Sequence, residues 1–377
     1  MKLRALVLAL TVTALFPIHS VAAEVTSKSQ QTAPGVFIDT SIYLPKKTPA
    51  PAILLAHGFG GSKDSVVTEA QAFQKRGYVV MTWTARGFGK STGQISMNSL
   101  SAEIADVQQL ITTLSKRKDV LQDRAGDPVV GITGGSYGGA AALLTASQDK
   151  RIDAVVADIT WNDLSQALFP QSSKDLDEPG PFKKIWTGTF FALATLQSAY
   201  LGECGALTNE WCAAYKSAVM NGQPSTAERK LLRSVSPASV LSSIKAPTLL
   251  SQGQADSLFP LTESFNSAKA IEKAKPNLPL ALIWHAGGHD GGIDQTSYLR
   301  EQYLQWFKKN LLKEKIEFPA FQFTKTNGSI SLQDSTVIPK VFACPKLPTD
   351  ATVKQLQLLT PTVALSFPIG GIPSAIS

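Results

Sequence analysis

The most reactive pattern in the chain is the pentapeptide GGSYG at residues 134–138, in which a serine stands two positions from a glycine on each side. An apolar segment, Pro128 to Thr133, precedes it and a small-residue segment, Ala140 to Ala146, follows, which predicts a strand, a tight turn and a helix. Such a turn exposes the serine hydroxyl for attack on a carbonyl carbon, and the glycines leave room around it. We therefore expect Ser136 to be a nucleophile; the alternative is a glycine-rich turn of purely structural use.

A serine nucleophile needs a base, and beyond the first 23 residues the chain offers His57, His285 and His289. When the serine lies on a strand-to-helix turn of this kind, the base follows it late in the chain, which leaves His285 and His289. His285 continues the apolar run Leu278 to Trp284, where an imidazole is expected to pack as a structural group. His289 lies in a loop flanked by glycine pairs, so we expect His289 to be the base.

The acid that orients the base should follow an earlier strand. Asp256 lies just beyond the apolar segment Pro247 to Ser251, and we expect it to accept the ring N–H of His289 and to stabilise the imidazolium. Asp158 is a rival, because it follows another expected strand. Asp290 is adjacent to His289, but adjacency in sequence does not supply the required geometry.

Two backbone amides are expected to bind the oxyanion that forms on the attacked carbonyl. One belongs to Tyr137, which follows the serine at the start of a helix, and the other to Phe59 in the loop HGFGG at residues 57–61. His57 is then expected to brace this loop. The turn RGFGKS at residues 86–91 resembles the end of a phosphate-binding loop, but Thr84 stands where such a loop needs glycine, so we interpret it as structural.

Apolar segments that alternate with helical patterns must position these groups. The strand segments are apolar on both sides, as in a parallel sheet covered by helices on both faces, and they predict an α/β fold. The expected strands are 36–44, 52–56, 79–83, 128–133, 154–157, 247–251 and 278–284. The expected helices are 65–75, 100–114, 140–146, 262–274 and 296–312.

The alternation is interrupted once and ends before the carboxyl terminus. Residues 161–243 are mostly helical in pattern and rich in aromatic residues, which predicts a helical lid inserted between two parts of one core, 24–160 and 244–316. Most of these rings are expected to pack within the insertion, and a few to line an apolar acyl pocket. Residues 317–377 predict a β-rich appendage, either reduced or truncated, because Phe318 to Phe323 and Ser329 to Leu332 alternate like antiparallel strands.

The amino-terminal residues 1–23 predict a signal peptide. Lys2 and Arg4 precede the apolar run Ala5 to Phe16, and small residues follow at 21–23. An uncleaved anchor is the competing interpretation, but 12 apolar residues fall short of the roughly 20 needed to span a bilayer. We therefore expect an exported protein without a transmembrane segment after removal of the signal.

The amino-acid composition limits the kinds of partner that the protein is expected to bind. Hydrophobic residues make up 44% and charged residues 17% of the 377, which is typical of a globular protein. The net charge of +7 comes from scattered residues without an aromatic-interleaved basic stripe, so nucleic-acid binding is not expected. Cys204 and Cys212 could form a disulfide if the chain is exported, or remain two buried thiols, and Cys344 would be left over. The spacing of the three matches no metal site.

Taken together, the runs HGFGGSK, RGFGKSTG, GGSYGG and GGHDGG and the loop that holds Asp256 resemble the X-Pro dipeptidyl-peptidase-like hydrolases, a group that includes cocaine-esterase-like acyl hydrolases. The resemblance covers about Ile53 to Leu312. It implies the α/β-hydrolase fold, a Ser-His-Asp triad and two-step acyl transfer, with no metal or cofactor. The substrate would be an acyl compound, either a small molecule or a peptide.

The sequence departs from this group in two places. Members often carry a tyrosine, whose hydroxyl assists, at the place of Phe59, and they usually have a full C-terminal β-sandwich where about 60 residues follow the core here. The backbone amides must then suffice, and an esterase is favoured over a peptidase. The alternatives are an acyltransferase of the same fold and a catalytically silent binding module. The sequence carries no indication of the oligomeric state.

Overall fold

The computed structural model describes residues 25–170, 179–197, 202–325 and 330–333. The expected signal peptide, Tyr200 of the insertion, Cys344 and most of the expected appendage lie outside the described residues. In the part of the chain that is described, no helix combines the length and the apolar character needed to cross a bilayer.

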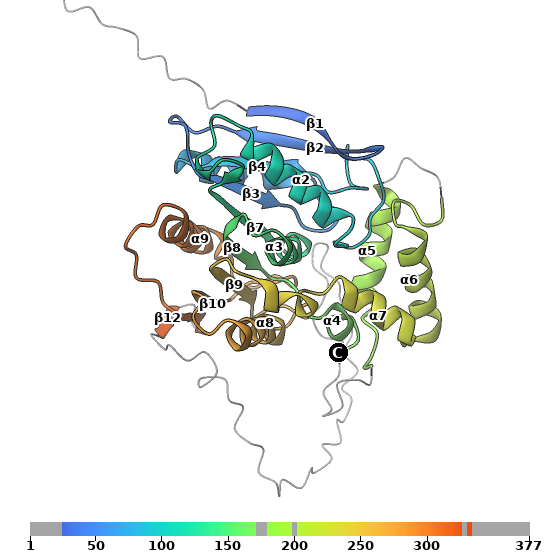
Figure 1. The fold of residues 1–377 in the computed structure, drawn as a ribbon. Coiled ribbons are helices and arrows are strands. Elements are labelled where there is room, and N and C mark those ends of the chain that lie inside the picture. Colours follow the sequence, from blue (N-terminus) through green and yellow to red (C-terminus); the bar gives the residue numbers. More distant parts are fainter. Residues whose placement is uncertain (1–24, 171–178, 198–201, 326–329, 334–377) are drawn as a thin grey trace, which may run out of the picture.

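A ten-stranded sheet runs through the molecule (Figure 1). Seven neighbouring strands, from β4 to β11, are parallel, and antiparallel strands lie at both edges. In order across the sheet, the strands are β1 (Val25–Ala33), β2 (Val36–Tyr43), β4 (Val79–Trp83), β3 (Ala52–Ala56), β7 (Val130–Gly135), β8 (Ile152–Asp158), β9 (Thr248–Gly253), β10 (Leu280–His285), β11 (Phe321–Thr324) and β12 (Ile330–Gln333). A separate small hairpin pairs β5 (Gln122–Arg124) with β6 (Asp127–Pro128).

Helices cover both faces of the sheet, which confirms the predicted α/β-hydrolase architecture (Figure 1). Because side chains alternate along a strand, Leu54 packs in the cluster on one face and Ile53 and Leu55 in the cluster on the other. The first face is covered by α2 (Glu103–Ser115), α3 (Tyr137–Gln148) and α8 (Leu261–Ala274), and the second by α1 (Val67–Lys75) and α9 (Thr296–Leu311).

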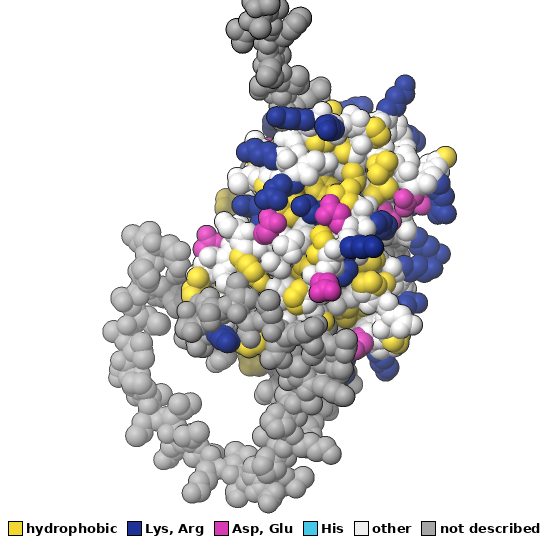
Figure 2. Space-filling model, turned by 90° about the vertical axis from the view of Figure 1, so that its left-hand side faces the viewer, with side chains coloured by type: hydrophobic (Ala, Val, Ile, Leu, Met, Phe, Trp, Pro, Cys, Tyr) yellow, Lys and Arg dark blue, Asp and Glu magenta, His cyan; other side chains and the backbone are white. Residues whose placement is uncertain are grey.

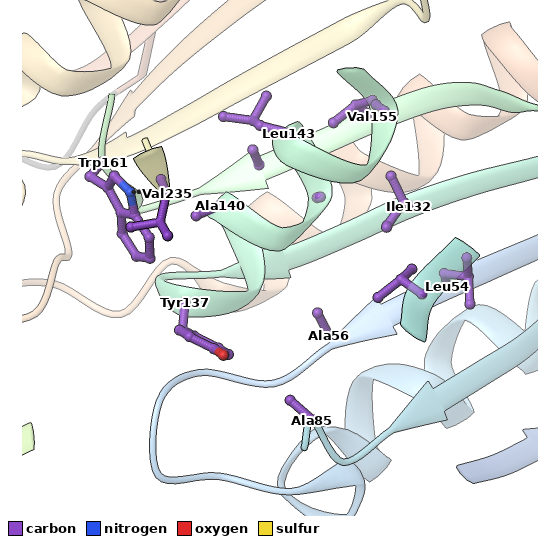
Figure 3. Packing of buried hydrophobic residues seen from close by; sticks show 14 of the residues in the cluster. Leu54, Ala56, Ala85, Ile132, Tyr137, Ala140, Leu143, Val155, Trp161 and Val235 are labelled. Atoms are coloured by element: carbon purple, nitrogen blue, oxygen red, sulfur yellow. Dashed lines mark hydrogen bonds between the residues drawn. The ribbon is translucent and has the colours of Figure 1, made fainter. Parts of the chain in front are cut away.

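Small residues let α3 lie close to the sheet. Figure 3 shows Ala140 and Leu143 of this helix together with Ile132 of β7 and Leu54, which belong to the same buried cluster. The same figure shows the Trp161 indole donating to the carbonyl of Val235 at 3.1 Å, which ties the beginning of the insertion to its end.

The insertion is helical, as its pattern predicts. It comprises α4 (Leu164–Leu168), α5 (Lys184–Leu196), α6 (Asn209–Asn221) and α7 (Thr226–Ser234), followed by 3-10 turns at Pro237–Ser239 and Leu241–Ser243. Cys204 and Cys212 form a disulfide that joins the connection before α6 to the first turns of that helix. Figure 1 shows α5 and α6 side by side at the edge of the molecule.

Several elements differ from the sequence prediction. Strand β1 was not predicted, because its residues VTSKSQQTA are mostly polar and exposed at the edge of the sheet. The helix expected over 65–75 is a 3-10 turn, Lys63–Val66, followed by α1. The residues expected to begin a separate β appendage instead extend the main sheet, since β11 pairs with β10 in parallel and β12 pairs with β11.

Charged side chains are dispersed over the face of the molecule that is seen in Figure 2. Figure 2 shows one face of the molecule, on which Lys and Arg side chains are interspersed with acidic and hydrophobic ones. No continuous basic stripe crosses this face.

The turn between β7 and α3 brings three backbone segments close together. Ser136 has φ 56° and ψ −120°, a conformation rarely adopted by residues other than glycine, and its amide donates to the Asp158 carbonyl at 2.9 Å. A Cβ at Gly138 would lie 2.8 Å from the carbonyl oxygens of Ala56 and His57, and one at Gly134 would lie 2.7 Å from the Gly138 carbonyl carbon. Only glycine lets these backbones approach so closely.

We expect Gly138→Ala to lower the free energy of unfolding by about 2 kcal/mol, because the new methyl group would displace backbone rather than a flexible side chain. Chemical denaturation measures this loss. Gly188→Ala is the matched control, since a Cβ there meets only the Tyr215 hydroxyl, at 3.6 Å. Equal stability of the Gly138 and Gly188 variants would show that the turn is not constrained as described.

Candidate active site

Three parallel strands, β7, β9 and β10, deliver the expected nucleophile, acid and base to one edge of the sheet, and β8 lies between β7 and β9. Ser136 follows β7, Asp256 follows β9 and His289 follows β10, and the carboxyl ends of parallel strands share an edge. The Ser136 hydroxyl donates to His289 Nε2 at 2.9 Å, and His289 Nδ1–H donates to Asp256 Oδ2 at 2.7 Å. The imidazole can therefore remove the hydroxyl proton while the carboxylate stabilises the charge that results.

Burial and backbone contacts fix the acid. The Asp256 side chain has no exposed surface, and its Oδ1 accepts from the Phe259 amide at 2.7 Å while Oδ2 is occupied by His289. The imidazole of His289 is held by ring edges, with the Phe259 centroid at 5.3 Å and the Trp186 centroid at 5.8 Å. These contacts leave the base little freedom to turn away from Ser136.

Asp290, the acid next in sequence to His289, has a different role in the structure. Its carboxylate accepts from the amide and the hydroxyl of Ser257, so it holds the loop that carries Asp256. The Asp290 amide donates to the Ala255 carbonyl at 3.1 Å. The loops after β9 and β10 are thus bonded to each other on both sides of the acid.

The remaining rivals, His285 and Asp158, pair with each other. His285 Nε2–H donates to Asp158 Oδ1 at 3.2 Å, and the Ser251 hydroxyl donates to the same oxygen at 2.7 Å. The Tyr303 hydroxyl continues the chain by donating to Ser251 Oγ at 2.9 Å. The Asp158 carbonyl also accepts a hydrogen bond from the Ser136 amide. The network that holds the Asp158 side chain therefore also helps to hold the turn that carries Ser136.

The loop after β3 lies against the amino end of α3, as the two expected oxyanion amides require. An added Cβ at Gly58 would lie 3.9 Å from the Gly135 carbonyl oxygen, and the rings of Phe59 and Tyr137 meet edge to face with centroids 5.6 Å apart. Neither the Phe59 nor the Tyr137 amide donates a hydrogen bond to any residue in the described ranges. An anion at this helix terminus would be stabilised by both amides and by the helix dipole.

His57 braces this loop in its neutral form. Its Nδ1–H donates to the Gly58 carbonyl at 2.7 Å, and its Nε2 accepts from the Ala85 amide at 2.9 Å. Burial lowers the pKa of His57 to about 4. The RGFGKS turn is likewise structural, since Ser91 donates to the Thr84 carbonyl and accepts from the Asp39 amide.

An apolar pocket of about 100 Å³ lies beside this loop, between it and the insertion. Its lining includes Phe59 and Met97 of the core and Ala214 and Leu232 of the insertion. Among its walls are six aromatic residues of the insertion, namely Phe169, Phe182, Phe190, Phe191, Trp211 and Tyr215. In contrast, Trp161 is buried in the main core and Trp186 faces His289.

Sequence comparison now identifies the family. The model of the X-Pro dipeptidyl-peptidase (S15) family matches residues 34–291, which is more than half of the chain. The chain belongs to the S15 family. Its fold is that of the α/β hydrolases, as the motifs suggested.

This member of the S15 family is also similar to individual proteins. It is 30% identical to the thiohydrolase aneE of Aspergillus aculeatus over 129 residues, which cover 33% of this chain and 38% of the relative. It is 30% identical to the quorum-quenching protein AidA of Acinetobacter baumannii over 131 residues, which cover 33% and 41%. A CocE/NonD family hydrolase from Staphylococcus aureus matches 88% of this chain and 62% of its own, with a TM-score of 0.59 and 16% identity.

The matches span less than two thirds of each of these relatives. The structural match shows a shared fold, and the family model shows the family.

The neutral His57 predicts a pH dependence of stability. Its pKa is near 6.5 in the unfolded chain and about 4 in the folded one, so the unfolded state binds the proton first as the pH falls. The stabilisation is complete above pH 6.5 and is lost as the pH falls towards 4. Between pH 7 and pH 5, the free energy of unfolding should fall by about 2 kcal/mol more in the wild type than in His57→Gln. Parallel pH slopes in the two proteins would contradict a buried neutral imidazole.

Proposed function

We propose that this protein is an exported serine hydrolase that cleaves esters with an apolar acyl group through an acyl-enzyme. The observation that carries the proposal is the continuous chain from Ser136 through His289 to Asp256, with hydrogen bonds of 2.9 and 2.7 Å. Membership in a hydrolase family supports it.

The reaction would have two steps, the acylation of Ser136 and the hydrolysis of the acyl-enzyme. Ser136 Oγ attacks the carbonyl carbon while His289 Nε2 takes its proton, and the Phe59 and Tyr137 amides stabilise the oxyanion. His289 then protonates the leaving alcohol as its bond to the acyl carbon breaks. A water molecule that gives a proton to His289 attacks the acyl-enzyme, and the returning proton restores Ser136 as the acid leaves.

The substrate preference is argued from the pocket beside the oxyanion loop. Its walls are almost entirely aromatic and aliphatic, and they include the side chain of Phe59, whose amide we place at the oxyanion. An acyl chain held in this pocket would have its carbonyl near the loop. A peptidase would in addition need polar groups for the substrate amine, so an ester with an apolar acyl group is favoured.

Export is proposed from the pattern of the first 23 residues and is supported by the disulfide. The bond between Cys204 and Cys212 is of a kind that persists in oxidising compartments outside the cytosol.

Fluorophosphonate labelling tests the triad. We expect the wild type to react, Ser136→Ala to lose labelling entirely, and His289→Ala and Asp256→Asn to lose about 10⁴-fold in the hydrolysis of p-nitrophenyl esters, because a base that is absent or wrongly oriented cannot activate the serine. Asp290→Asn is the matched control for charge, and it should retain far more activity than Asp256→Asn. An unreactive, folded wild type would favour a binding module over an enzyme.

Filling the pocket tests the acyl preference. Ala214 lines the pocket, whereas its neighbour Ala213 is exposed, so Ala214→Phe and Ala213→Phe add the same ring in two places. We expect Ala214→Phe to reduce kcat/KM for the octanoate ester about tenfold relative to the acetate ester, and Ala213→Phe to leave the ratio unchanged. An unchanged ratio in both variants would place the acyl chain elsewhere.

A further inference from the structure

Helix α5 of the insertion contacts both loops on which the proposed reaction depends. At its amino end, the N-cap residue Lys183 donates through Nζ to the carbonyls of Ser257 and Leu258 at 2.6 and 2.9 Å. One turn later, the Trp186 indole donates to Ser257 Oγ at 3.2 Å. These contacts fall on the residues directly after Asp256.

At its carboxyl end, the same helix holds the oxyanion loop. The C-cap residue Gln197 donates through Nε2 to the Gly60 carbonyl at 2.8 Å, and its Oε1 accepts from the Gly89 amide at 3.2 Å. The Leu193 side chain lies so close to Gly60 that an added Cβ would be 3.0 Å from its Cδ1. The Phe190 ring packs on Phe59 with centroids 5.3 Å apart.

We propose that α5 is a brace that sets the positions of two loops, the acid loop (residues 256–259) and the oxyanion loop (residues 57–61). Lys183 and Gln197 are then positioning residues for the reaction. This inference rests on the proposed function. It assigns the insertion a role beyond covering the site, because one rigid element fixes two loops that belong to different strands.

The chemistry of the two end residues supports this assignment. The Lys183 ammonium loses hydration where it reaches the two carbonyls, and this burial lowers its pKa. Gln197 presents one donor and one acceptor, and uses both to join the loops at Gly60 and Gly89. Along α5, contacts to the acid loop end near Trp186 and contacts to the oxyanion loop begin near Phe190, so each end controls a different loop.

The two ends can be tested separately with side chains of similar length. Lys183→Met removes the donor to the acid loop, and Gln197→Met removes both hydrogen bonds at the oxyanion loop. Gln197→Glu keeps an acceptor for Gly89 but places a carboxylate against the Gly60 carbonyl. Lys184→Met and Gln223→Met are matched controls, because both side chains are exposed in the same insertion.

Steady-state kinetics on a p-nitrophenyl ester should separate positioning from binding. We expect Lys183→Met, Gln197→Met and Gln197→Glu to lower kcat about ten- to a hundredfold with KM within about twofold of wild type, since a misplaced loop weakens stabilisation of the transition state. The control variants should match the wild type. Wild-type kcat in all three brace variants would overturn the inference.

Amide hydrogen exchange provides a readout that does not need activity. Exchange should rise within residues 57–61 in Gln197→Met and within residues 256–259 in Lys183→Met, and in neither segment in the controls. Unchanged exchange in both variants would overturn the brace even if the enzyme is active. Loop-specific changes in a protein whose wild type is unreactive would instead uphold the brace and reject the proposed hydrolase.

Discussion

The close approach of backbones at the turn between β7 and α3 is the constraint on which the rest of the site depends. A non-glycine residue at φ 56° costs on the order of 1–3 kcal/mol, and Ser136 keeps this conformation because its surroundings leave it no other. The carbonyls of Ala56 and His57 lie too close to Gly138 for any side chain there, and the Asp158 carbonyl accepts a hydrogen bond from the Ser136 amide. The turn therefore fixes both the serine hydroxyl and the distance to the oxyanion loop.

The same edge of the sheet carries two histidine–carboxylate pairs, and their surroundings separate their roles. His289 lies in a loop flanked by glycines, beyond the end of β10, and its ring accepts a hydrogen bond from Ser136. His285 is the last residue of β10, and its ring donates to Asp158. The lower pair has Ser251 and Tyr303 as further partners and leaves no ring nitrogen for the nucleophile, since the Gly287 amide donates to His285 Nδ1. Position relative to the strand end, rather than residue type, distinguishes the two pairs.

Much of this arrangement could be predicted from the sequence. Parallel strands that are buried on both faces appear in the sequence as continuous apolar segments, and the residues that follow such strands must all lie at the carboxyl edge of the sheet. That reasoning predicted the fold and selected the three residues that the structure brings together. It missed β1, whose polar edge residues carry no burial pattern, and it did not foresee that β11 joins the sheet. Lys183 and Gln197 were also missed, since a lone lysine or glutamine in a helical insertion carries no signal of the loop it contacts.

The distance along the chain between the proposed nucleophile and base has a consequence for synthesis. Ser136 and His289 are 153 residues apart, and β8, the entire insertion, β9 and β10 are made between them. A nascent chain that has completed the serine turn cannot contain its base until three more strands have been added. If Ser136 is the nucleophile that we propose, it would therefore gain its base only after these elements have been made.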